Sequence, residues 1–302
     1  MAPKFVPKPP IEKLPLAVRK DYRDKYEANK SDWEAKIAEL LGFPLTFNFD
    51  LNAVWAYSQD NAPTAGYICG GYVEGLISAL ERFVDKFGDT GRAYIKNAVT
   101  TGEVRLAVND KKPNETIDGD VRDGVYYILF GADRLGSNQG YQFDELTRAI
   151  NRVPYQGFTL LAKHSMETVY EPEIDEVREH INEILNSKEV VLEPNFEALY
   201  AALQKREDPD WQRVLGDAAL GYFRDGVASQ LERQGFKGDE MLQEGFFEGV
   251  PSKTIKLRIV DKIKSGEYSE AVIEDGVLYI QTTVDRWWSN ISDAGQGILD
   301  LL

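Results

Sequence analysis

Two stretches of this chain repeat one another. Residues 123–138 (DGVYYILFGADRLGSN) align without gaps with residues 275–290 (DGVLYIQTTVDRWWSN), and nine of the 16 positions are identical. Ordinary residue usage would give about one identity over such a stretch. The period of about 150 residues is too long for a solenoid unit of about 20–50 residues, and it matches the size of a whole domain. This repeat predicts two copies of one domain.

Other segments fall into register in the same order and at nearly the same offset. Residues 103–110 match residues 254–261, and residues 37–41 match residues 181–185. We therefore predict an internal tandem duplication. The predicted parts of the chain are an extended Pro/Lys-rich arm over 1–16, a first repeat over 17–152, a linker over 153–164 and a second repeat over 165–302.

Each repeat is predicted to be α+β. Apolar residues at helical spacing predict an opening helix that includes residues 33–41 in the first copy and residues 174–185 in the second. Short strands are expected next, over 43–49 in the first copy and 190–192 in the second. Helices follow, the longest of which has a continuous apolar stripe. In the first copy the stripe consists of Ile68, Tyr72, Leu76, Leu80, Val84 and Phe87. Glycines in these helices, such as Gly75 and Gly226, predict close helix packing or a nearby backbone.

Each copy is expected to end in three short strands. The first copy offers 104–108, 116–122 and 125–130, and the second offers 254–260, 269–273 and 277–284. An Asp-Gly pair between the last two strands predicts a hairpin, because both central positions of a tight primed turn need positive φ. The predicted fold class is thus α+β with an internal duplication, in which a helical layer packs on a small, mostly antiparallel β-meander in each half.

The net charge of −15 disfavours two classes of partner. An acidic surface repels phosphate backbones and anionic lipid headgroups, so we expect no nucleic-acid binding and no membrane binding. No segment has the apolar run of a membrane span or a signal peptide, and the single cysteine cannot form an internal disulfide. A soluble, cytoplasmic protein is expected, in which the two repeats form an internal pseudo-dimer and the chain can be monomeric.

The sequence contains none of the motifs that identify an enzyme class. Dinucleotide-binding, zinc-protease, nucleophile-elbow and Cys-x-x-Cys patterns are missing, so no cofactor and no metal are predicted. Cys69 with His164 or His180 could form a thiol nucleophile with its base. Because the residues around Cys69 are apolar, a buried structural cysteine is the favoured interpretation.

One polar motif occurs in both copies, at the end of the last predicted strand. It consists of Asp133, Arg134, Ser137 and Asn138 in the first copy and of Asp285, Arg286, Ser289 and Asn290 in the second. A carboxylate, a guanidinium and two small polar side chains could bind a ligand there. The structural alternative is an Asp–Arg ion pair followed by a Ser or Asn cap on the next helix. Trp287 and Trp288 could stack on a flat ligand, or they could close a core or an interface.

The sequence supports two hypotheses. The first is a binding or interaction protein, whose small-molecule or protein partner is held in a cleft between or beside the repeats. The alternative is a carboxylate-based hydrolase or isomerase, in which Asp133 or Asp285 acts as acid or base and the adjoining arginine stabilises charge. Because an acid–base carboxylate needs a partly desolvated position, exposure of both aspartates would argue against the enzyme.

Overall fold

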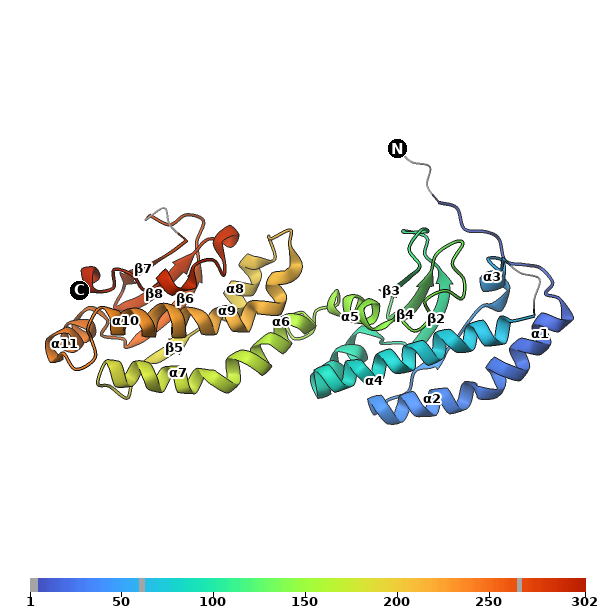
Figure 1. The fold of residues 1–302 in the computed structure, drawn as a ribbon, viewed down its shortest axis with the longest axis horizontal. Coiled ribbons are helices and arrows are strands. Elements are labelled where there is room, and N and C mark those ends of the chain that lie inside the picture. The colour runs from blue at the N-terminus through green and yellow to red at the C-terminus, as the bar shows by residue number, and fades with distance from the viewer. Residues whose placement is uncertain (1–4, 60–62, 265–267) are drawn as a thin grey trace. The chain divides into compact units, whose positions relative to one another are not determined.

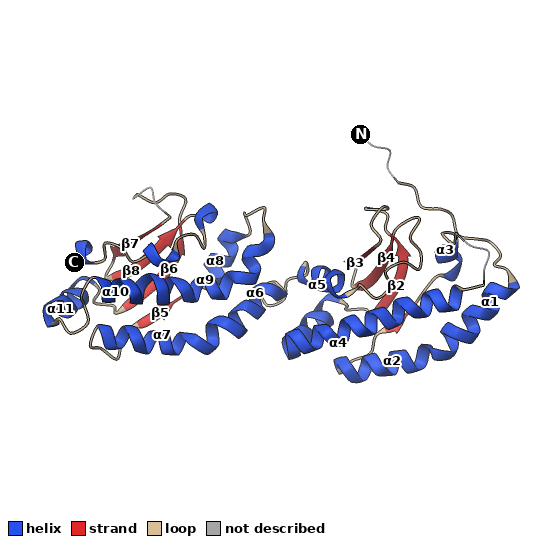
Figure 2. Cartoon of the chain, viewed as in Figure 1, coloured by secondary structure: helices blue, strands red, loops and turns tan. Residues whose placement is uncertain are grey.

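The chain forms two compact units. The computed structural model describes residues 5–59, 63–264 and 268–302, which divide into unit 1 (Met1–Leu160) and unit 2 (Leu161–Leu302). Each unit contains helices and one four-stranded sheet (Figure 1). In each unit the long helices lie along the sheet, as Figure 2 shows. The prediction of a mixed helix and strand fold is confirmed.

Unit 1 begins with helices and ends with a helix. In the predicted arm, described residues 5–15 form neither helix nor strand, and residues 1–4 lie outside the described residues. The elements, in which η1 is a π-helical turn, are α1 (Leu16–Tyr22), η1 (Arg23–Glu27), α2 (Ala28–Leu41), β1 (Thr46–Phe47), α3 (Leu51–Trp55), α4 (Ala65–Ala98), β2 (Glu103–Val108), β3 (Ile117–Arg122), β4 (Val125–Phe130) and α5 (Phe143–Asn151).

Unit 2 has helices and strands in a similar order, but its helical segments are divided into more and shorter pieces. Its elements are α6 (Leu160–Ser165), η2 (Met166–Tyr170), α7 (Glu171–Ile184), β5 (Val191–Glu193), α8 (Phe196–Leu203), η3 (Pro209–Val214), α9 (Leu215–Gly221), η4 (Tyr222–Ala228), α10 (Ser229–Arg233), α11 (Glu240–Gly249), β6 (Thr254–Ile259), β7 (Ser269–Glu274), β8 (Val277–Thr282) and the short 3₁₀ turns η5 (Val284–Arg286), η6 (Ile291–Asp293) and η7 (Leu299–Leu301).

Both sheets are mixed, and they share one topology. The strand orders are β1-β2-β4-β3 and β5-β6-β8-β7. In unit 1, β2 pairs in parallel with both β1 and β4, and β3 pairs antiparallel with β4; unit 2 has the same pairings. The prediction of a mostly antiparallel meander is therefore wrong. The Asp-Gly turn fixes only the hairpin, and its second strand lies between the other two, so β2 and β3 are not neighbours.

The two hairpin turns follow the prediction. Asp123 and Gly124 have φ values of 51° and 75°, and Asp275 and Gly276 have 50° and 73°. These values are typical of the primed turn that suits the right-handed twist of two paired strands. The flanking residues pair antiparallel along the whole of β3–β4 and β7–β8.

The core of each unit lies between the sheet and the long helices. In unit 1, Val104, Ile128 and Phe130 are fully buried on the strands. Tyr72 of α4 is also fully buried, and its ring centroid lies 6.3 Å from that of Phe130. The α4 stripe is continuous because apolar residues recur at three- and four-residue intervals. Among the described residues, none of the helices is both long and apolar enough to cross a membrane.

Near the start of each unit, two helices cross closely at a glycine, and the contacts at the two crossings are alike. In unit 1 the Gly66 N–H donates to Asp21 Oδ2 over 2.8 Å, and in unit 2 the Gly216 N–H donates to Ser165 Oγ over 2.9 Å. A Cβ on either glycine would come within 3.0 Å of the backbone carbonyl of that partner. A π-helical turn, η1 or η2, follows each crossing. The backbones can cross this closely only because the residue is glycine.

Candidate functional site

The repeated Asp-Arg-x-x-Ser-Asn motif lies in the loops that follow β4 and β8. Asp133 and Asp285 are both exposed, as are Arg134, Asn138 and Asn290, whereas Ser137, Arg286 and Ser289 are half-buried. An exposed carboxylate lacks the desolvation that tunes an acid or base. The acid–base hypothesis therefore loses the physical condition that it requires at these two aspartates.

These loops are held by one tyrosine in each unit. The Tyr72 hydroxyl accepts the Gly136 N–H over 2.9 Å, and the Tyr222 hydroxyl accepts the Trp288 N–H over 3.3 Å. Asn138 and Asn290 have φ values of 53° and 47°, a left-handed conformation in which asparagine is enriched. The repeated asparagine thus has a backbone role, because it lets both loops take the same turn.

The expected helix cap is not found. The N-cap residues of the next helices are Gln142 for α5 and Asn290 for η6, and neither makes a side-chain capping hydrogen bond. The loop instead packs on glycines of the long helix. A Cβ on Gly75 would come within 3.0 Å of the Gln139 carbonyl, and one on Gly226 within 3.0 Å of the Ile291 carbonyl. The prediction of a backbone brought close to these helix glycines is confirmed.

The two tryptophans take different positions. Trp287 is 4% exposed, and its ring centroid lies 5.2 Å from that of Tyr222, which places it in the core of unit 2. Trp288 is 49% exposed and has a φ of 67°. Only Trp288 presents a ring to solvent, so the two rings do not form one stacking platform.

The cysteine and the metal-ligating side chain types give neither an activated thiol nor a metal cluster in the described part of the chain. Cys69 is buried in α4, and this burial raises the pKa of its thiol to about 12, which opposes thiolate formation at neutral pH. His180 Nε2 lies 3.4 Å from Glu232 Oε1 at the surface of unit 2. In the described residues, no group of three or more His, Cys, Asp or Glu side chains could hold a metal ion.

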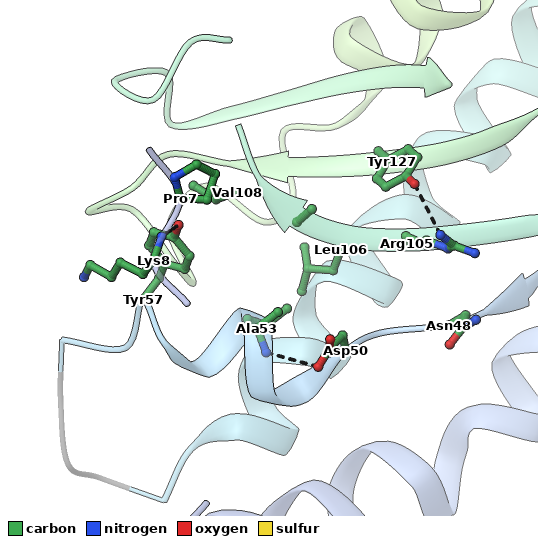
Figure 3. A pocket seen from close by; sticks show the side chains of 12 residues that line it. Pro7, Lys8, Asn48, Asp50, Ala53, Tyr57, Arg105, Leu106, Val108 and Tyr127 are labelled. Atoms are coloured by element: carbon green, nitrogen blue, oxygen red, sulfur yellow. Dashed lines mark hydrogen bonds between the residues drawn. The ribbon is translucent and has the colours of Figure 1, made fainter. Parts of the chain in front are cut away.

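A pocket of about 220 Å³ opens in unit 1 where β1 ends (Figure 3). Its apolar lining comes mainly from Leu106, Ala107 and Val108 on β2 and from Ala53, Val54 and Tyr57 in and after α3. The arm supplies Pro7 and Lys8. The pocket exists because β1 has only two residues, so the chain leaves the edge of β2 halfway along it and turns into α3.

The polar groups of the pocket are already engaged. The Arg105 side chain donates to Glu103 Oε2 over 2.5 and 3.0 Å, and its Nη1 lies 3.4 Å from the Tyr127 hydroxyl. These contacts raise the pKa of Arg105. Asp50 Oδ1 accepts the Ala53 N–H over 3.1 Å as the N-cap of α3. Because Arg105 is paired with Glu103 and most of the lining is apolar, the pocket suits an uncharged apolar group.

Unit 2 has a large side chain at the equivalent place. Register and sequence alignment put Arg258 of β6 where unit 1 has Ala107. The Arg258 guanidinium lies 4.1 Å from the centroid of Tyr279 and donates to Glu274 over 2.7 and 2.8 Å. Tyr279 corresponds to Tyr127 of the pocket. In unit 1 the ring of Tyr127 also has an arginine beside it, since the Arg122 guanidinium of β3 lies 5.4 Å from its centroid. Ala107 lines the pocket and Arg122 does not.

Sequence reasoning missed this pocket. Its lining comes from separate parts of the chain between Pro7 and Tyr127, and most of these residues are ordinary core types. None of the ten residues predicted from the repeated motif lines it. The alignment of residues 103–110 with 254–261 contained one signal, because it places the small Ala107 in the same column as the large Arg258.

The comparisons with known proteins return no likeness. No family model, no curated protein and no solved structure matches this chain. The function is therefore argued from the geometry of the site.

Proposed function

We propose that this protein is a binding protein, and that unit 1 takes an uncharged apolar group of its ligand into the pocket beside β2. The observation that carries the proposal is the apolar pocket itself, whose lining includes Ala107 at the position where unit 2 has the larger Arg258. Pockets for drug-sized ligands begin at about 300 Å³. A volume of about 220 Å³ therefore suits a group the size of a side chain better than a nucleotide.

The proposal includes an ancestral duplication. The shared strand order, the two Asp-Gly turns, and the equivalent glycine crossings at Gly66 and Gly216 support it. After duplication the two copies would have diverged at the pocket. Binding is thus assigned to unit 1, while the same region of unit 2 is stabilised by its own arginine.

The test is binding of a small apolar probe to the full chain. Isobutanol titrated into ¹⁵N-labelled protein should shift the amide resonances of Leu106, Ala107 and Val108 more than those of Leu257, Arg258 and Ile259. Ala107→Arg should abolish the shifts, because the longer side chain would fill space in the pocket that Ala107 lines. Ala107→Ser is the matched control and should respond like the wild type.

Equal shifts in both units, or unchanged binding by a folded Ala107→Arg variant, would contradict the proposal. The amide spectrum of each variant reports whether unit 1 keeps its fold.

A further inference from the structure

We infer that the ligand is an extended peptide, which pairs through its main chain with the free edge of β2 and places one aliphatic side chain in the pocket. This inference rests on the proposed function and adds the chemical class of the ligand. It concerns residues 106–108 of β2, beyond the end of β1.

β1 pairs with the first part of this edge of β2, and no other strand in the described part of the chain pairs with the rest. The Thr46 N–H donates to the Gly102 carbonyl over 2.7 Å, and the Asn48 N–H donates to the Val104 carbonyl over 2.9 Å. In a parallel pair, alternate residues direct their N–H and C=O groups to the same neighbour. Leu106 and Val108 are next in this series, and β1 ends before it reaches them. Unpaired strand edges of this kind can accept an added strand.

An extended segment of this chain, the arm, lies at one end of the pocket. The Lys8 N–H donates to the Tyr57 hydroxyl over 2.7 Å, and Lys8 Nζ lies 5.0 Å from the centroid of that ring. Further along the arm, Ile11 and Asn52 exchange hydrogen bonds through Ile11 N–H to Asn52 O and Asn52 Nδ2 to Ile11 O. Figure 3 shows Pro7 beside Val108. An extended segment already occupies that end, and the pocket lies between it and Asn48.

The lining selects the side chain. Side chains alternate along β2, so Leu106 and Val108 line one face of its edge and Ala107 lines the other, which makes the edge aliphatic on both faces. Arg105 is paired with Glu103. A charged peptide side chain would be desolvated among these aliphatic side chains, at a substantial free-energy cost. Valine, isoleucine or leucine fits the chemistry, and their burial drives binding.

The experiment uses capped pentapeptides acetyl-Ser-Thr-X-Thr-Ser-amide, in which X is each of the 20 amino acids. Binding to the full chain is measured by fluorescence anisotropy on labelled peptides and by the amide shifts of Leu106 and Val108. We expect X = Val, Ile or Leu to bind about tenfold or more tightly than X = Asp or Lys. Methylation of the main-chain nitrogen of X, or of the residue on either side, should weaken binding about tenfold at one or more positions, because a hydrogen bond to β2 is lost.

Each outcome has a defined meaning. If isobutanol shifts the pocket amides but no X binds, or N-methylation at all three positions has no effect, the peptide inference is wrong and the proposed function stands. If neither isobutanol nor any peptide shifts these amides, both fail. Ala107→Arg should remove peptide binding and Ala107→Ser should keep it; peptide binding that survives in folded Ala107→Arg would overturn the inference.

Discussion

At the scale of single residues, the two units use equivalent tyrosines for the same purpose. Tyr72 and Tyr222 are buried in the long helices, and each hydroxyl accepts a backbone N–H from the loop after the last strand. Burial raises the pKa of both phenols, so the hydroxyls stay protonated over the ordinary pH range. The sequence shows that Gly-Tyr recurs in both helices, but it does not reveal the partner, because the bonded loop residues differ: Gly136 in one copy and Trp288 in the other.

Replacing Tyr72 with phenylalanine should lower the free energy of unfolding by about 1 kcal/mol, because the Gly136 N–H loses its acceptor. Tyr222→Phe should also destabilise the protein, because it removes the 3.3 Å bond to the Trp288 N–H and a hydrogen bond with the Thr282 side chain. Tyr67→Phe serves as the control, because Tyr67 is 69% exposed. Urea unfolding measures all three. An equal effect of Tyr67→Phe would contradict the assigned role of Tyr72.

A carboxyl pair in unit 1 predicts a pH effect on stability. Burial, reinforced by the neighbouring Asp118, raises the pKa of Glu145 above its ordinary 4.5, although Arg148 acts in the opposite direction. The folded state then holds this proton more tightly than the unfolded state does. Stability is therefore greatest below pH 4.5 for this group, and falls as pH rises through the raised pKa.

Glu145→Gln should remove this decline and make the protein more stable than the wild type at pH 7. The lost ion pair with Arg148 should matter little, because the Arg148 side chain is 52% exposed. Thermal unfolding between pH 4 and pH 8 measures the difference. A variant that is less stable than the wild type at pH 7 would show that the charge on Glu145 stabilises the fold. An unchanged pH profile would show that Glu145 does not cause the decline.

At the scale of elements, the sequence predicts where strands and turns lie better than it predicts which strands pair with one another. Residues 125–130 were predicted as a strand and form β4, and the Asp-Gly turns were correct, because both depend on local residue preferences. The parallel pairing of β2 with β4 was missed. The alternation of buried and half-buried residues in β2 is the same whichever strand lies beside it, so it does not identify the neighbour. The pocket was missed for a related reason. It depends on the early end of β1, which was predicted to span 43–49 and has two residues.

The helix crossings predict which glycines tolerate a side chain. Gly66→Ala or Gly216→Ala should each destabilise the protein by about 1–3 kcal/mol, because the new methyl group would meet a backbone carbonyl that cannot move freely. Gly245→Ala in α11 is the matched control. Its Cβ would meet nothing within 4 Å, so it should stabilise the helix by up to about 1 kcal/mol. Calorimetry of the three variants measures whether each substitution lowers or raises the stability of the protein.

At the scale of the whole molecule, charge is divided unequally along the chain. Residues 161–302 contain 28 of the 50 acidic and 15 of the 35 basic residues, which gives unit 2 a net charge of −13 out of −15. The overall acidity thus describes unit 2 far more than unit 1. Repulsion among like charges destabilises a compact state, and salt screens it.

Raising sodium chloride from about 50 to 500 mM should therefore protect unit 2 more than unit 1, because the Debye length falls over this range. Hydrogen exchange of the full chain, followed by mass spectrometry, resolves the two units. We expect slower exchange in β6–β8 at high salt and a smaller change in β2–β4. Equal responses would show that local ion pairs, and not net charge, control the salt effect.

The burial of Cys69 in α4 has a practical consequence. It is the only cysteine of the chain, and the high pKa of its thiol keeps it unreactive while the helix is packed. A thiol-specific reagent can label it only when that part of unit 1 opens. The unmodified protein therefore carries its own kinetic reporter: the labelling rate, followed with and without a bound peptide, would measure how often the first unit opens and how far a ligand suppresses that opening.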